Sequence, residues 1–151
     1  MGTITVAQEG RVGAPADLTY RLIADDAHHQ QFLPEGITDF EVVEGGVGAG
    51  TLHRFTVKAG GRAREYLMRV DEPQPGRVLT ETDQSSSLVT TFTVTPAGDA
   101  CMVRIETRWS GAGGIGGFFE RTLAPRVLRK MYADELARLD SYASDQAAAT
   151  T

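Results

Sequence analysis

Apolar and polar residues alternate with a period of two through most of the stretch between residues 37 and 109. This alternation predicts strands that each bury one face. Short stretches rich in glycine and proline, among them GGVGAG, DEPQPG and PAGD, divide the alternation into six successive segments. Closely spaced strands joined by such turns are typical of an antiparallel meander. The predicted strands are ITDFEVVE, TLHRFTVKA, REYLMRV, RVLTETD, SSSLVTTFTVT and ACMVRIETRW.

Further elements are predicted on both sides of the meander. Residues 3–12 have the pattern of one more strand, and APADLTYRLIADD and AHHQQFLP then predict two short helices. A long helix is predicted from Gly117 to Ala143, with a kink or a break at Pro125. Residues 144–151 have no apolar periodicity, so we expect a disordered tail after a single domain of residues 1–143.

The alternation also predicts which face of each strand is buried. In the last strand, Arg104 and Arg108 lie on one face, and the apolar residues on the other face are expected to point inward. The final helix is the predicted element long enough to cover the apolar face of the sheet, which gives an α+β fold. Its apolar stripe consists of Val127, Leu128, Met131, Tyr132, Leu136 and Leu139.

This order of elements resembles the helix-grip fold of the START-related (SRPBCC) superfamily, in its polyketide cyclase/dehydrase-like branch. The stretches that carry the resemblance are VGAPADLTYRLIAD, EGGVGAGTLHRF, VDEPQPGRVLTE and YADELARLDSYA, and the resemblance extends over residues 3–143. It implies a curved antiparallel sheet of about seven strands wrapped around the C-terminal helix, with an apolar cavity between them. Members of the superfamily include lipid carriers and polyketide aromatase/cyclases, so the fold alone does not choose the function.

Inward-facing positions on the strands and helices predict the residues that line the implied cavity. The expected polar lining consists of His53, Arg64, Tyr66, Thr80, Thr82, Thr90 and Thr107. The expected apolar lining consists of Phe32, Phe55, Met68, Phe92, Trp109, Phe119, Leu123, Val127 and Met131.

Three of the polar residues are candidates for catalysis. His53 has a side chain that titrates near neutral pH and could act as a base, and Arg64 and Tyr66 could stabilise an enolate. Each also has a structural interpretation, because a core histidine, a strand-end arginine and a buried tyrosine all occur without a catalytic role. We expect no inward-facing Asp or Glu on the middle strands, and this expectation favours binding over catalysis.

Three functions therefore remain open. The first is binding of a small hydrophobic molecule such as a lipid, a quinone or a polyketide-like compound. The second is a polyketide aromatase/cyclase or dehydrase that uses the same cavity. The third is a protein-interaction module with a vestigial pocket, which would expose an apolar patch. Such a patch, or the contact of a homodimer, could be formed by the outward-facing Leu52, Leu67, Leu79 and Val89, so we expect a monomer or a homodimer.

Cofactor and metal sites find little support in the sequence. Gly111, Gly113 and Gly116 form the pattern GxGxxG, but no further strand with an acidic residue follows the helix, so we expect a hinge and no cofactor. The stretch DDAHH contains metal-ligating residue types, yet adjacent side chains on a helix point about 100° apart, so we expect no metal.

Charge and hydropathy exclude two further classes of protein. The net charge of −5 argues against nucleic-acid binding, which needs a basic surface. No apolar run reaches the roughly 18 residues of a membrane span, and the N-terminal residues lack the pattern of a signal peptide. We therefore expect a cytoplasmic protein without a membrane span.

Overall fold

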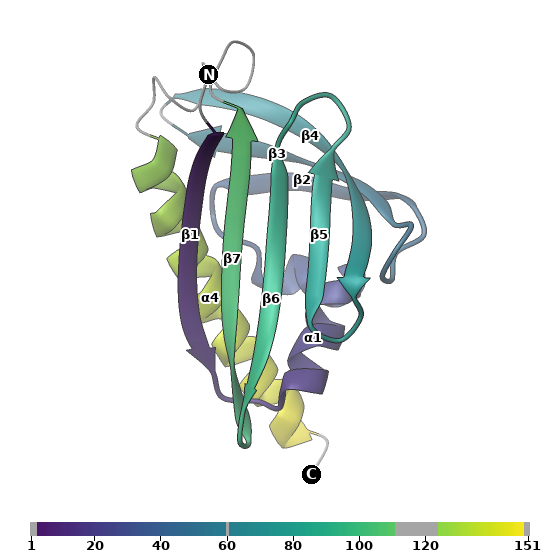
Figure 1. Cartoon of the computed structure of the whole chain (residues 1–151), viewed down its shortest axis with the longest axis vertical. Helices are drawn as coiled ribbons and strands as arrows, with labels where there is room; N and C mark the ends of the chain where they lie inside the picture. Colours follow the sequence, from purple (N-terminus) through teal and green to yellow (C-terminus); the bar gives the residue numbers. More distant parts are fainter. Residues whose placement is uncertain (1–2, 60, 111–123, 150–151) are drawn as a thin grey trace.

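A curved antiparallel sheet of seven strands dominates the structure (Figure 1). The computed structural model describes residues 3–59, 61–110 and 124–149. In the sheet the strand order is β1-β7-β6-β5-β4-β3-β2, so β1 and β7 are neighbours although they lie far apart in the sequence. The strands are β1 (Thr3–Val12), β2 (Ile37–Glu44), β3 (Leu52–Ala59), β4 (Arg62–Gln74), β5 (Val78–Asp83), β6 (Val89–Ala97) and β7 (Ala100–Ser110).

The described helices are α1 (Ala16–Ala24), α2 (Asp26–His29), the 3₁₀ helix η1 (Gln30–Phe32) and α4 (Ala124–Ala149). Figure 1 shows α4 running along one side of the sheet behind β1 and β7, with α1 near the C-terminal half of α4. The predicted helix-grip fold is confirmed. None of these helices has the length and apolar character needed to cross a membrane.

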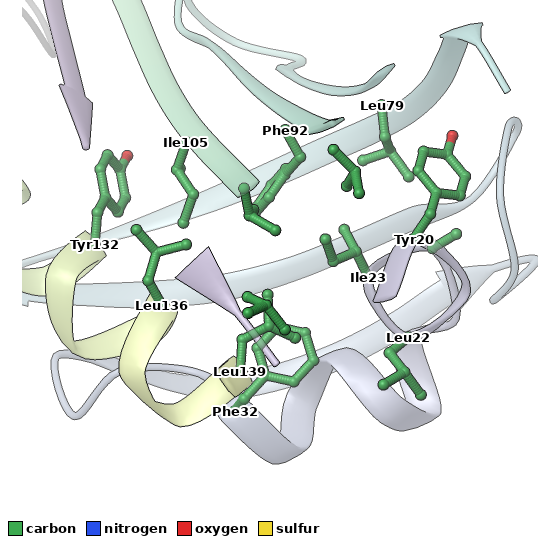
Figure 2. Close-up of a cluster of buried hydrophobic side chains, with 14 of the residues drawn as sticks. Tyr20, Leu22, Ile23, Phe32, Leu79, Phe92, Ile105, Tyr132, Leu136 and Leu139 are labelled. Carbon is green, nitrogen blue, oxygen red and sulfur yellow. The ribbon is translucent and has the colours of Figure 1, made fainter. Parts of the chain in front are cut away.

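The core forms where the apolar stripe of α4 meets the inward face of the sheet. Leu128, Tyr132, Leu136, Leu139 and Ala143 are all buried, and their spacing of three or four residues places them on one side of the helix. Figure 2 shows Tyr132 and Leu136 beside Ile105 and Phe92 of the sheet, and Leu139 beside Phe32. Burial of each large apolar side chain contributes roughly 1.5–3 kcal/mol, which holds α4 against the sheet.

Truncating this stripe will destabilise the protein. Leu139 is 1% exposed, so Leu139→Ala leaves a cavity and will lower the free energy of unfolding by about 2–5 kcal/mol. The matched control is Lys130→Ala, an exposed position on the same helix, which will change that free energy by less than about 0.5 kcal/mol. Urea unfolding followed by circular dichroism measures both values, and equal effects would contradict the packing described here.

Helix α4 and strand β4 both end at later residues than the sequence analysis predicted. Helix α4 continues through residues 144–149, which the sequence analysis placed in a disordered tail. Alanine favours helix without any apolar periodicity. Ala147 also packs against the core, and the Oγ of Ser144 donates a hydrogen bond to the carbonyl of Gly13 (3.3 Å).

Strand β4 continues to Gln74, into the predicted DEPQPG turn. Its pairing with β5 shifts register between Asp71 and Gln74, which accommodates the extra residues.

Pro125 and the glycine stretch before it are only partly described. Helix α4 begins at Ala124, so Pro125 occupies its first turn, where proline removes no helical hydrogen bond. The predicted kink or break at Pro125 is therefore not seen in the described part of the helix. Gly111, Gly113 and Gly116 lie outside the described residues, as does the predicted helical stretch from Gly117 to residue 123.

The inward face of β5 is the opposite of the predicted one. Leu79, Glu81 and Asp83 are buried, whereas Thr80 and Thr82 are only partly buried on the other face. The predicted face left the carboxyl groups of Glu81 and Asp83 outside, but both are paired in the structure, and pairing makes buried charges tolerable.

Leu52 and Leu79 are buried too, so they cannot belong to the exposed apolar patch that the interaction-module hypothesis required.

Candidate functional site

A cavity of about 60 Å³ lies between the sheet and α4. Its wall is largely apolar, with a small group of ionisable side chains from α2, β3, β5 and α4. The lining residues are His29, Leu33, Ile37, Phe40, His53, Phe55, Val57, Tyr66, Met68, Glu81, Leu88, Thr90, Phe92, Thr107, Leu128, Met131, Tyr132 and Glu135.

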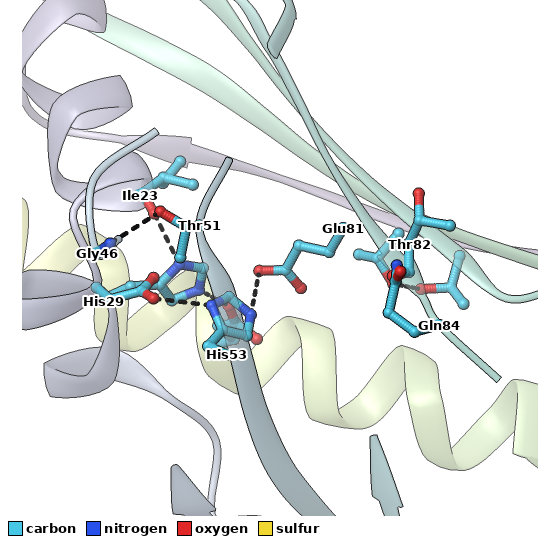
Figure 3. Close-up of polar contacts among 12 residues, drawn as sticks. Ile23, His29, Gly46, Thr51, His53, Glu81, Thr82 and Gln84 are labelled. Atoms are coloured by element: carbon cyan, nitrogen blue, oxygen red, sulfur yellow. Dashed lines mark hydrogen bonds and ion pairs between the residues drawn. The ribbon is translucent and has the colours of Figure 1, made fainter. Parts of the chain in front are cut away.

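His53 lies between two carboxyl groups that come from different elements. Its Nδ1 is 2.8 Å from Oδ2 of Asp26 at the start of α2, and its Nε2 is 3.4 Å from Oε2 of Glu81 on β5. Figure 3 shows the contact between His53 and Glu81. Because both ring nitrogens face a carboxylate, the imidazole is best accommodated as the doubly protonated cation.

His29 forms a second buried pair, with Glu135 of α4. Its Nδ1 is 2.8 Å from the carbonyl oxygen of Ile23, which can only accept, so Nδ1 carries a proton and donates. Its Nε2 is 3.2 Å from Oε2 of Glu135, and one mobile proton is held between these two groups. His29 also stacks on Phe32, with ring centroids 4.8 Å apart, which fixes the orientation of the imidazole.

The environment moves the pKa values of these groups in different directions. Burial lowers the pKa of His53, but the hydrogen bonds and charges of Asp26 and Glu81 outweigh burial and raise it to about 10. Burial likewise lowers the pKa of His29, and the hydrogen bond and charge of Glu135 reverse this and leave it raised.

The two glutamates of the cavity respond in opposite ways. Burial raises the pKa of Glu81, but the hydrogen bond and charge of His53 outweigh burial and lower it below the ordinary value. Burial raises the pKa of Glu135 as well, and there the opposing effect of His29 is too small to reverse it. The two glutamates therefore differ in how readily they take up a proton, Glu135 more readily than Glu81.

A chain of hydroxyl groups completes the polar lining. The hydroxyl of Tyr132 on α4 is hydrogen-bonded to Oγ1 of Thr107, which lies 2.7 Å from Oγ1 of Thr90. Burial is the main cause that raises the pKa of Tyr132, so its hydroxyl stays protonated at neutral pH.

The structure brings many of the predicted lining residues together at this cavity. Those that line it are His53, Phe55, Tyr66, Met68, Thr90, Phe92, Thr107 and Met131. Those that do not are Phe32, Arg64, Thr80, Thr82, Trp109 and Val127. Phe119 and Leu123 lie outside the described residues.

Arg64 is placed beside the cavity rather than in its wall. Its guanidinium carbon lies 5.0 Å from the ring centroid of Tyr66, and its Nη2 is 3.3 Å from Oδ2 of Asp83. The Oγ of Ser86 also lies 2.6 Å from that carboxyl oxygen. Asp83 thus neutralises Arg64 within a partly buried pair.

The sequence analysis missed the carboxyl groups of the site. Asp26 and His29 were considered only as metal ligands, and the described residues contain no group of three or more side chains placed to hold a metal ion. Neither Glu81 nor Glu135 was predicted to line the cavity. One signal was available in the sequence of β5. Side chains two residues apart on a strand point to the same face, so an inward-facing Leu79 places Glu81 inward as well.

Comparison with known proteins places the chain in a family. The model of the family described as "Polyketide cyclase / dehydrase and lipid transport" matches residues 3–144. The chain belongs to this family. A comparison with the curated proteins finds no match. The family assignment agrees with the resemblance found in the sequence and supports a fold that binds hydrophobic ligands.

Solved structures with the same fold include members of several branches. The KanY protein is similar over 95% of this chain and 99% of its own, with 32% identity and a TM-score of 0.84. The Zhui aromatase/cyclase from a Streptomyces species is similar over 95% of this chain and 94% of its own, with 19% identity and a TM-score of 0.69. Norcoclaurine synthase from Thalictrum flavum, in complex with dopamine and hydroxybenzaldehyde, shows 17% identity, a TM-score of 0.68 and coverage of 95% and 88%. At these last two identities the likeness concerns the fold alone.

Proposed function

We propose that the protein binds a small, mostly apolar molecule in the cavity, through a polar group of the ligand that donates a hydrogen bond to Glu81. The observation that carries this proposal is that the buried Glu81 carboxylate has one long polar contact. Its side chain is 9% exposed and lines an apolar cavity, and its closest polar contact among the described residues is His53 Nε2, at 3.4 Å. A carboxylate so weakly satisfied favours a ligand that supplies a donor.

The dimensions of the cavity restrict the ligand. Pockets for drug-sized ligands usually enclose about 300–1,000 Å³, far more than the 60 Å³ of this cavity. A compact molecule with one ring and one polar group is the class that fits best. A longer lipid or polyketide-like ligand needs additional space, which half-buried side chains of the wall such as Met131 and Phe40 can provide by changing rotamer.

Benzyl alcohol and toluene test this proposal, because they share a ring and differ in a hydroxyl donor. A hydrogen bond to a charged acceptor contributes about 1.5–3 kcal/mol, so benzyl alcohol will bind at least about tenfold more tightly than toluene. Glu81→Gln, which keeps only a neutral acceptor, will reduce this difference. The affinities are measured by titration of the backbone amide resonances in NMR spectra.

Two neighbouring residues of β3 provide a matched pair that tests the location. Val57 lines the cavity, whereas Thr56 lies on the opposite face of the strand. Val57→Phe fills the cavity and will weaken binding at least about tenfold, and Thr56→Phe will leave it unchanged. Equal affinities in the two variants, or no binding of either molecule by the wild-type protein, would refute cavity binding.

A second function, acid–base catalysis on a carbonyl compound, is favoured by a separate observation. Glu81 and Glu135 line the same cavity, and their pKa values are shifted in opposite directions. Such pairs are typical of enzymes that use one group as base and the other as acid. The family description includes cyclases and dehydrases, and the Zhui aromatase/cyclase shares the fold.

In this reaction Glu81 accepts a proton from the carbon next to the carbonyl group, and the electron pair of the broken C–H bond forms the C=C bond of an enol. Glu135 gives its proton to the carbonyl oxygen, so the charge of the ligand does not change. The enol can then attack a second carbonyl group of the same chain, as cyclisation of a polyketide-like substrate requires. Dehydration needs the same two groups, with proton loss at carbon and protonation of a leaving hydroxyl.

Exchange of the α-protons of phenylacetone for deuterium, near neutral pD, measures this activity directly. We expect the wild-type protein to accelerate exchange over buffer, and Glu81→Gln to reduce the acceleration at least about a hundredfold. Glu65→Gln, an exposed change on β4, serves as the control and will exchange at the wild-type rate. If the wild-type protein binds phenylacetone without accelerating exchange, the cavity serves binding alone.

A further inference from the structure

The ionisable side chains of the cavity do not balance in charge. Five of them are buried, three carboxyl groups and two imidazoles; four line the cavity, and Asp26 contacts His53. When all five are ionised, the cluster carries one more negative than positive charge. The five are Asp26, His29, His53, Glu81 and Glu135, which are between 1% and 7% exposed.

No other described group near the cavity supplies the missing positive charge. Arg64 is paired with Asp83 at 3.3 Å, so this pair is neutral as a whole. Tyr66 and Tyr132 face the cavity as neutral phenols, since burial raises the pKa of each. An unbalanced buried charge costs several kcal/mol, so an additional positive charge is strongly favoured here.

The position of the missing charge follows from the pairing distances. Asp26 is held by His53 at 2.8 Å, which is a close charge-assisted contact. The contacts of the two glutamates are longer, 3.4 Å for Glu81 and 3.2 Å for Glu135. Both glutamates line the cavity, and the charge of Glu81 acts on Glu135 and raises its pKa. These two carboxyl groups are therefore the ones best placed to receive an additional positive charge.

We propose that the ligand of this cavity is a small aromatic or aliphatic amine, bound as the ammonium ion between Glu81 and Glu135. This inference rests on the proposed function and adds the chemical class of the ligand. An ammonium group offers three donors to two carboxyl groups and supplies the missing charge.

The remainder of the cavity wall suits the apolar part of such an amine. Phe40, Phe55, Tyr66 and Phe92 all line the cavity, so an amine bound there is surrounded by aromatic rings. Ring faces attract a cation, with about 2 kcal/mol or more when the cation is desolvated.

Benzylamine and benzyl alcohol distinguish this proposal, because both have one ring and a donor but only the amine is cationic at pH 7. Isothermal titration calorimetry of the whole chain will show at least about tenfold tighter binding of benzylamine.

Substitutions of the two glutamates test whether they cause the tighter binding of benzylamine. Glu81→Gln and Glu135→Gln will each reduce the ratio of the two affinities to near one, while Glu65→Gln, exposed on β4, will keep the wild-type ratio. If either glutamine variant fails to fold, the ratio of the two affinities for the wild-type protein decides the matter. Benzyl alcohol binding as tightly as benzylamine would overturn the amine proposal and leave ligand binding intact. Failure of toluene, benzyl alcohol and benzylamine alike to bind would overturn the proposed function together with it.

Discussion

Replacing His53 with leucine will lower the free energy of unfolding by about 3–5 kcal/mol, because the change leaves Asp26 and Glu81 buried without their shared cation. The imidazole is 1% exposed, so water cannot replace it. Urea unfolding at pH 7 measures the loss. The deficit will shrink as the pH falls, because without His53 burial raises the pKa of Glu81, which then takes up a proton more readily.

The next residue along β3 provides the control for this experiment. Arg54 forms an ion pair with Glu41 in which both side chains are about half exposed. Exposed ion pairs contribute about 0–1 kcal/mol, so Arg54→Leu will have a small effect although it also removes a cation from the same strand. A loss for His53→Leu no larger than that for Arg54→Leu would show that His53 is not the counter-charge of a buried cluster.

The second large effect is a loss of stability of the wild-type protein on going from pH 6.5 to about pH 10. The pKa of His53 is raised from 6.5 to about 10 by folding, so its contribution to stability is fully present below pH 6.5 and is lost as the pH rises through 10. His29 and Glu135 also have raised pKa values and act in the same direction. Glu81 has a lowered pKa and acts in the opposite direction, since its contribution is lost in acid.

Together these shifts predict greatest stability near pH 5–6.5, with a loss on the order of 3 kcal/mol by pH 10. Urea unfolding at pH 6, 8 and 9.5 checks this expectation. His53→Gln will flatten the alkaline slope, whereas His28→Gln will keep it, because Nδ1 of His28 contacts the hydroxyl of Tyr142 at 2.6 Å and no carboxylate among the described residues. A wild-type protein of constant stability between pH 6 and 9.5 would contradict the charged state assigned to His53.

The fold was predictable from the sequence because it depends on repeated patterns. The alternation along β3, β6 and β7 identifies the buried face at each step, and an error at one residue is corrected by its neighbours. The stripe of α4 is likewise repeated over several turns. Much of the apolar lining, such as Phe55 and Phe92, follows from these patterns without knowledge of any contact.

The ionisable part of the site was not predictable in the same way. A glutamate in a strand is normally a solvent-facing residue, and the burial of Glu81 is made tolerable by His53 of another strand, which lies beside it. His29 and Glu135 are 106 residues apart in the sequence and meet only when α4 crosses the sheet. Single pairs of this kind leave no periodic signal, so they become visible only with the tertiary structure.

The pairing of β1 with β7 bears on how the chain reaches its folded state. Thr3 is opposite Ser110 and Val12 is opposite Cys101, so the first strand pairs with the last one of the seven. Contacts between such distant parts of a chain slow folding, because a long loop is closed before they form. During synthesis β1 therefore emerges long before its partner, and so does His29, whose partner Glu135 follows 106 residues later. Assistance by a chaperone during this interval, and aggregation in its absence, are the expected behaviour of a nascent chain with this topology.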